Sequence, residues 1–72
     1  MSKHSLSIFA TSLKKLREQC SLTQPQLAQL ISSTRETIGS WEQGVSTPNP
    51  EMIVRLKNAL NCSFDELLEG KV

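Results

Sequence analysis

The stretch that decides the fold is QPQLAQLISSTRETIGSWEQG, residues Gln24–Gly44. It predicts two short helices separated by a tight turn at Ser32–Ser33. The first helix begins at the T-x-x-Q capping box of Thr23–Gln26, with a proline in its first turn, where the missing N–H removes no hydrogen bond. The second helix spans about 34–43 and stops before Gly44, because glycine readily takes the left-handed conformation that ends a helix.

The second of these helices has two chemically different faces. At about 100° per residue, Ile38 and Trp41 point one way. The opposite face is small and polar and consists of Glu36, Gly39, Ser40 and Gln43. On the first helix, Ala28 is small enough to let the two helices cross closely. A second helix that is anchored from behind while its polar face stays free is typical of a helix-turn-helix, whose second helix lies in the DNA major groove.

Three further helices are predicted, and no strand alternation occurs. One spans about Ser7–Cys20 and follows an arm that contains His4. The next is capped by Asn49, has a proline at its first position and ends near Asn61, and the last opens with the S-x-x-E capping box of residues 63–66. The apolar residues expected to be buried on these helices are Phe9, Leu13, Leu16, Cys20, Ile53, Leu56, Leu60, Phe64, Leu67 and Leu68.

Length and composition exclude several classes of function. Seventy-two residues predict one all-α domain, 1–72, with an ordered core of about 7–69. Two cysteines without CxxC spacing do not make a zinc site, and we expect two buried, reduced thiols. No nucleophile–base pair, acidic metal cluster or glycine-rich phosphate loop is present, so we expect no enzyme, no metal and no cofactor. The absence of a signal peptide and of a long apolar run predicts a cytoplasmic protein with no membrane partner.

The chain resembles the Cro/repressor (XRE) family of helix-turn-helix transcription regulators. The matching segments are LKKLREQCSLTQPQLA (13–28), STRETIGSWEQGVSTP (33–48) and ALNCSFDELLEG (59–70). The resemblance implies a compact, lambda-repressor-like bundle of five helices with the helix-turn-helix at the second and third. It also implies a sequence-specific regulator, in our interpretation a repressor, that binds a palindromic operator on double-stranded DNA as a homodimer. The dimer contacts would come from the last helix and the segment before the fourth, so the dimer is expected to be weak without DNA.

The resemblance assigns roles to individual residues. Gln24 matches a glutamine that grips a DNA phosphate and braces the recognition helix, and Arg17 and Glu42 match a partly buried ion pair. Positions that face bases or the flanking backbone are matched by Thr34, Arg35, Glu36 and Ser40. Positions on the phosphate side are matched by Thr37 and Gln43 with the loop Val45–Thr47. The DNA-binding residues are therefore expected to be Thr23, Gln24, Thr34, Arg35, Glu36, Thr37, Ser40, Gln43, Ser46 and Thr47.

The chemistry of the central positions agrees with reading of base edges. Arg35 can donate two hydrogen bonds to guanine O6 and N7, and Glu36 can accept one from cytosine N4. We expect the two side chains to be able to pair with each other when no DNA is bound. The net charge of +1, with its basic excess in residues 1–20 and none in the loop 45–47, predicts modest electrostatic affinity and a shallow salt dependence.

The chain also departs from the family pattern. Serine stands at 21 and 32, and asparagine at 61, where glycine is usual, so these turns either avoid positive φ or carry strain. Lys57 replaces a small residue, and its stem must extend out of the interface. Other functions reuse this fold, and three alternatives stay open: an antitoxin with a toxin partner, a restriction–modification controller, and a protein-interaction module that does not bind DNA.

Overall fold

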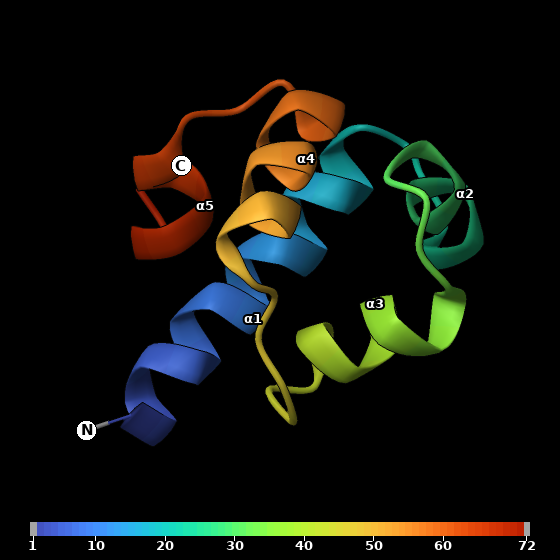
Figure 1. The fold of residues 1–72 in the computed structure, drawn as a ribbon. Helices are drawn as coiled ribbons and strands as arrows, with labels where there is room; N and C mark the ends of the chain where they lie inside the picture. The colour runs from blue at the N-terminus through green and yellow to red at the C-terminus, as the bar shows by residue number, and fades with distance from the viewer. Residues whose placement is uncertain (1, 72) are drawn as a thin grey trace.

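The computed structural model describes residues 2–71 and the side chains of residues 8–71. The described chain is helical, as predicted, and its five helices are joined by short turns (Figure 1). Their bounds are α1 Ser2–Gln19, α2 Gln24–Leu30, α3 Arg35–Glu42, α4 Pro50–Leu60 and α5 Phe64–Glu69. α1 packs against α3 and α5, and α2 packs against α3. α3 therefore has one side against the body of the molecule and forms its lower right edge in Figure 1.

The predicted helix starts are confirmed by their capping hydrogen bonds. At α2, Thr23 Oγ1 accepts from the backbone N–H of Gln26 at 3.2 Å, and the Gln26 side chain accepts from the N–H of Thr23 at 2.8 Å. The same reciprocal pair joins Ser63 and Glu66 at α5. Asn49 caps α4 by accepting from the third residue of the helix at 2.9 Å. These signals act within four residues, which is why the sequence alone reveals them.

Helices α1 to α4 end in the same way. One or two residues after the helix end the backbone is left-handed, and the next N–H bonds back to the carbonyl five residues earlier, which is a Schellman motif. α5 also ends at a left-handed residue, but there the N–H of Lys71 bonds to Asp65 O, six residues earlier, at 3.4 Å. The signature holds for Leu22 N to Arg17 O at 3.1 Å and for Ser33 N to Ala28 O at 2.8 Å. The left-handed residues are Ser21, Ser32, Gly44, Asn61 and Gly70. Two serines with φ near 60° carry backbone strain, which decides between the two alternatives that the sequence left open.

The start of α1 corrects one expectation. The helix begins at Ser2 and not at Ser7, so the backbone of His4 belongs to α1 and not to a separate arm. Residues 2–7 contain neither proline nor glycine, and nothing in their composition breaks a helix. The far end also differs by one residue, because α1 ends at Gln19.

The core lies where α1, α2, α3, α4 and α5 meet, and it contains most of the residues expected there. Its buried apolar members are Phe9, Leu13, Leu16, Leu27, Ala28, Ile31, Ile38, Trp41, Leu56, Leu60 and Leu67. On α5, however, only Leu67 is buried, while Phe64 and Leu68 are 43% and 42% exposed. The prediction was wrong for these two because a six-residue helix presents one central position to α1 and leaves its neighbours at the rim of the contact.

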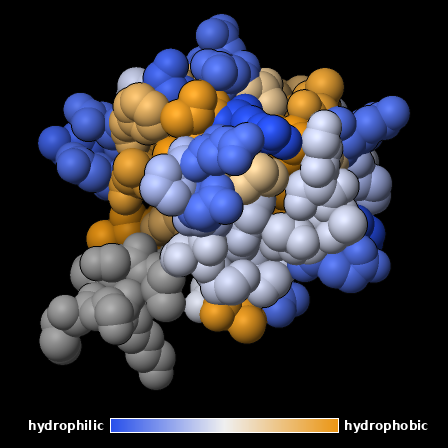
Figure 2. All heavy atoms as spheres, viewed as in Figure 1, coloured by the Kyte–Doolittle hydropathy of each residue, from blue (hydrophilic) through white to orange (hydrophobic). Residues whose placement is uncertain are grey.

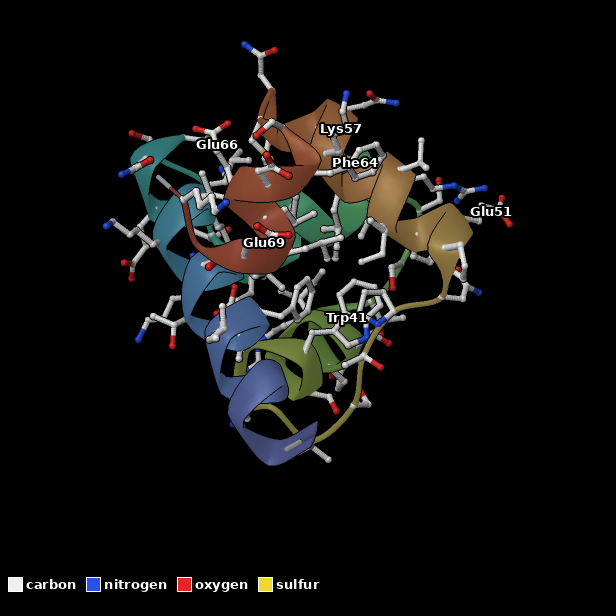
Figure 3. The ribbon with its side chains drawn as sticks, turned by 90° about the vertical axis from the view of Figure 1, so that its left-hand side faces the viewer. Trp41, Glu51, Lys57, Phe64, Glu66 and Glu69 are labelled. Atoms are coloured by element: carbon white, nitrogen blue, oxygen red, sulfur yellow. The ribbon has the colours of Figure 1, made fainter. Side chains whose placement is uncertain are left out.

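Lys57 lies beside the exposed ring of Phe64. Its ammonium is 5.4 Å from the ring centroid, and the two side chains run together between α4 and α5 (Figure 3). Lys57 is half-buried as a whole, and its charged end lies over the exposed ring of Phe64 at the first residue of α5. This cation–π contact partly covers the phenylalanine face that the core does not.

The expectation of two buried thiols was wrong. Cys20 is exposed and Cys62 is half-buried, and both are free. The spacing of Phe9, Leu13 and Leu16 places position 20 on the same stripe only while the helix continues, and α1 ends one residue before it. Burial raises the pKa of the Cys62 thiol, and the nearby Glu66 carboxylate adds to this effect. Among the helices of residues 2–71, none is long and apolar enough to cross a membrane.

Candidate nucleic-acid interface

α2 and α3 form a pair of short helices whose turn is fixed by hydrogen bonds. Ser32 N bonds to Gln29 O at 3.3 Å, and Thr34 then caps α3 by accepting from Thr37 N at 3.2 Å. Ile38 and Trp41 are 0% and 4% exposed, and Trp41 points into the body of the molecule in Figure 3. Two buried side chains three residues apart fix the rotation of α3, and the same rotation keeps its opposite face outside.

A buried polar network ties the end of α3 to α1 and α2. Arg17 Nε donates to Glu42 Oε2 at 2.6 Å, and Arg17 Nη2 donates to Glu42 Oε1 at 3.1 Å. The two side chains are only 10% and 4% exposed. Arg17 Nη1 also donates to the carbonyl of Leu22 at 2.7 Å. The hydrogen bond to Glu42 is the main cause that raises the pKa of the Arg17 guanidinium.

Gln24 connects this network to the outer face. Its Nε2 donates to Glu42 Oε1 at 3.0 Å, so the first residue of α2 holds the last residue of α3. A Cβ added at Gly39 would lie 3.8 Å from Gln24 Oε1. The glutamine amide therefore lies over the middle of α3, and one of its N–H groups remains available for a ligand.

The outer face of α3 lines an open hollow, which we call the α2–α3 hollow. It is lined by Gln24, Arg35, Glu36, Gly39, Ser40, Gln43 and Val45. Five of the ten expected DNA-binding residues thus lie together. Arg35 and Glu36 are both exposed, and none of the ion pairs of residues 8–71 joins them to each other. Figure 2 shows largely pale surface of intermediate hydropathy in this lower right region, between strongly hydrophilic patches.

The other five expected residues do not line the hollow. Thr34 and Thr37 lie at the start of α3, with their hydroxyls 2.9 Å apart. Ser46 lies beyond the end of α3, and its hydroxyl is 2.8 Å from that of Ser40. Thr23 caps α2, and Thr47 is exposed in the loop before α4. These hydroxyl-bearing residues lie beside the two helix starts and along the loop after α3, at the flanks of the hollow.

One contact that supports the motif was missed by sequence reasoning. Arg55 of α4 donates from Nη1 to the carbonyl of Ile31 at 3.1 Å, and from Nη2 to Glu51 at 2.8 Å. It thereby binds a carbonyl at the end of α2, next to the strained Ser32. No local pattern signals this contact, because the two partners lie 24 residues apart.

Comparison with known proteins agrees with this geometry. A helix-turn-helix family model, HTH_3, matches residues 13–67. The uncharacterized HTH-type transcriptional regulator YqaE of Bacillus subtilis is 34% identical over 64 residues, which are 89% of this chain and 55% of that protein. The chain thus spans about half the length of that relative.

Two solved structures share the fold. The P22 c2 repressor, in complex with a synthetic operator, superposes with a TM-score of 0.82 at 28% identity, covering 88% of this chain and 96% of that one. The restriction–modification controller protein C.AhdI of Aeromonas hydrophila gives 0.81 at 32% identity, covering 86% and 94%. The match is to a helix-turn-helix family and not to an enzyme family, as predicted. The chain therefore belongs to the HTH_3 (XRE/Cro-C1 type) helix-turn-helix family.

Proposed function

We propose that this protein is a sequence-specific transcription regulator that inserts α3 into the major groove of double-stranded DNA. The observation that carries the proposal is the outer face of α3. It is held from behind by two buried side chains and by the Arg17–Glu42–Gln24 network, and it presents polar groups that no other part of residues 8–71 covers. The P22 c2 repressor, whose solved chain this one matches over 96% of its length, is bound to an operator in its structure, which supports the same docking here.

Within this proposal the polar groups divide into two roles. Arg35 reads guanine and Glu36 accepts from cytosine N4, because both are exposed and no ion pair occupies either of them within residues 8–71. Gln24 donates its remaining amide N–H to a phosphate. The flanking phosphates are met by Thr23, Thr34, Thr37, Gln43, Ser46 and Thr47, while Ser40 faces the bases.

The operator is palindromic and the protein binds it as a homodimer, with half-sites one helical turn, about 34 Å, apart. Phe64 and Leu68, half-exposed on α5, supply apolar surface for the dimer, together with the segment before α4. Two side chains make a small contact, so dimerisation is assisted by DNA. Occupancy of the operator represses transcription inside the cell, the role that the name of the P22 relative also carries.

A restriction–modification controller is the second candidate. C.AhdI is matched over 94% of its chain, so a protein of this size and fold is sufficient for that role. A methyltransferase gene beside the gene for this chain, with the selected operator in front of it, would favour the controller over a repressor of unrelated genes.

The test begins with selection of binding sites from a random pool of double-stranded DNA. Gel-shift titration of the selected site then compares the wild type with Arg35→Ala, Gln24→Ala and, as control, Lys71→Ala, which removes an exposed positive charge outside the hollow. We expect Arg35→Ala to cost about 1–3 kcal/mol of affinity, Gln24→Ala to weaken binding to all sequences, and the control to bind as the wild type. Equal affinity of the wild type and the first two variants would contradict the proposal.

A further inference from the structure

Val45 lies directly after the end of α3, in a position that hydrogen bonds fix. Its N–H donates to Ser40 O at 3.0 Å, and the N–H of the left-handed Gly44 donates to Trp41 O at 3.2 Å. The next residue, Ser46, is held by its hydroxyl, 2.8 Å from that of Ser40. Residues 44–46 are therefore already ordered before a complex forms.

The side chain of Val45 has no partner of the kind that this motif usually supplies. In a Schellman motif, the residue in this position commonly makes an apolar contact with the last turn of the helix. Leu22 after α1 and Cys62 after α4 occupy the equivalent position, and both pack against the core. At the end of α3 the residue in the last turn that would make this contact is a serine, Ser40, and Val45 is 72% exposed, the largest value among the exposed large apolar side chains of residues 8–71.

The surroundings of Val45 show what it can contact. It lines the α2–α3 hollow, where the other lining residues are polar or charged, apart from Gly39. Its own N–H is already bonded to Ser40, and its side chain has no polar atom, so it has no hydrogen bond to offer to a phosphate. The phosphate-side role that the family resemblance suggests for this loop therefore does not suit Val45, although it suits Ser46 and Thr47.

We propose that Val45 selects thymine, by apolar contact with the C5-methyl group at one position of each half-site. This inference rests on the proposed docking of α3 in the major groove. In that groove the edges of the base pairs present hydrogen-bonding atoms and one apolar group, the thymine methyl. A branched apolar side chain, fixed at the rim of a polar reading surface, complements that group. The burial of one methyl is worth about fourfold in affinity for each half-site.

The experiment replaces thymine by uracil, one position at a time, in the operator obtained from the random pool. Uracil pairs with adenine in the same way and lacks only the methyl group. Fluorescence anisotropy titrations compare the wild type, Val45→Ala and the matched control Val54→Ala, which shortens another exposed valine on α4, outside the hollow. For the wild type we expect uracil to weaken binding about fourfold at one position of each half-site. Val45→Ala should bind the thymine and uracil operators equally at that position, and the control should behave as the wild type.

The possible failures are distinguishable. If the wild type and Val45→Ala show the same thymine-to-uracil ratio at every position, Val45 does not read the methyl. The proposed function still stands in that case, because the operator is bound and Arg35→Ala weakens it. If Val54→Ala loses the discrimination as well, the effect is not specific to the hollow, and the inference fails. If no selected DNA is bound at any salt concentration, the proposed function fails together with the inference.

Discussion

At the scale of single residues, the strained serines are the features most open to test. Ser32 has φ of 60°, whereas the neighbouring Ser33 lies outside the left-handed region. Left-handed backbone costs a residue with a Cβ about 1–2 kcal/mol. Glycine avoids this cost, but its greater conformational freedom in the unfolded chain lowers the stability of the fold by about 0.4–1 kcal/mol. We therefore expect Ser32→Gly to stabilise the domain by about 0.5–1 kcal/mol and to raise Tm by about 2–8 °C in a thermal unfolding measurement.

Ser33→Gly is the matched control for this substitution. It removes the same side chain one position away but relieves no strain, so it should lower Tm slightly. If Ser32→Gly melts at or below the temperature of the wild type, the turn after α2 is not strained in solution. Asn61→Gly should gain less than Ser32→Gly, because asparagine tolerates the left-handed region better than serine.

At the scale of the helix, the two glycines of the α3 segment should respond in opposite directions. Gly44 has φ of 75° and no atom within 4 Å of an added Cβ, so Gly44→Ala costs only backbone strain, about 1 kcal/mol. Gly39 lies inside the helix, where alanine makes the fold more stable than glycine does by about 0.5–1 kcal/mol. Its new methyl would contact Gln24 and occupy part of the hollow. Gly39→Ala should therefore be more stable in urea unfolding and bind operator more weakly, and a gain in both properties would contradict the placement of this face against DNA.

Some features of these helices can be predicted from the sequence, and others cannot. The starts of α2, α4 and α5 are encoded in capping residues within one turn, and the inner face of α3 follows from the spacing of Ile38 and Trp41. The exposure of Phe64 depends instead on how much of a short helix reaches α1, and the bond from Arg55 to Ile31 joins distant segments. Neither leaves a local signal. In the candidate site, local chemistry indicates Arg35 and Glu36, but the isolation of Val45 becomes visible only beside the packed Leu22 and Cys62.

At the scale of the whole molecule, charge limits how the protein can hold DNA. The net charge is +1, and Arg35 is the only cation that lines the α2–α3 hollow. Affinity must then depend on amides, hydroxyls and shape more than on the release of counterions. Each phosphate neutralised by lysine or arginine adds about −0.9 to the slope of log affinity against log salt, so six to ten such contacts give roughly −5 to −9.

We expect the operator complex of this protein to show a slope shallower than about −5 between 50 and 200 mM salt, measured by anisotropy titration. The double substitution Lys14→Ala and Lys15→Ala removes two charges on the exposed side of α1, outside the hollow. It should make the salt slope shallower still only if the basic N-terminal part of the chain contacts the phosphates. Arg35→Ala should lower affinity at every salt concentration while changing the slope little, because a base contact releases few counterions. A steep slope that collapses in Arg35→Ala would instead place this arginine on the backbone, and specificity would then have to come from the remaining groups of the hollow.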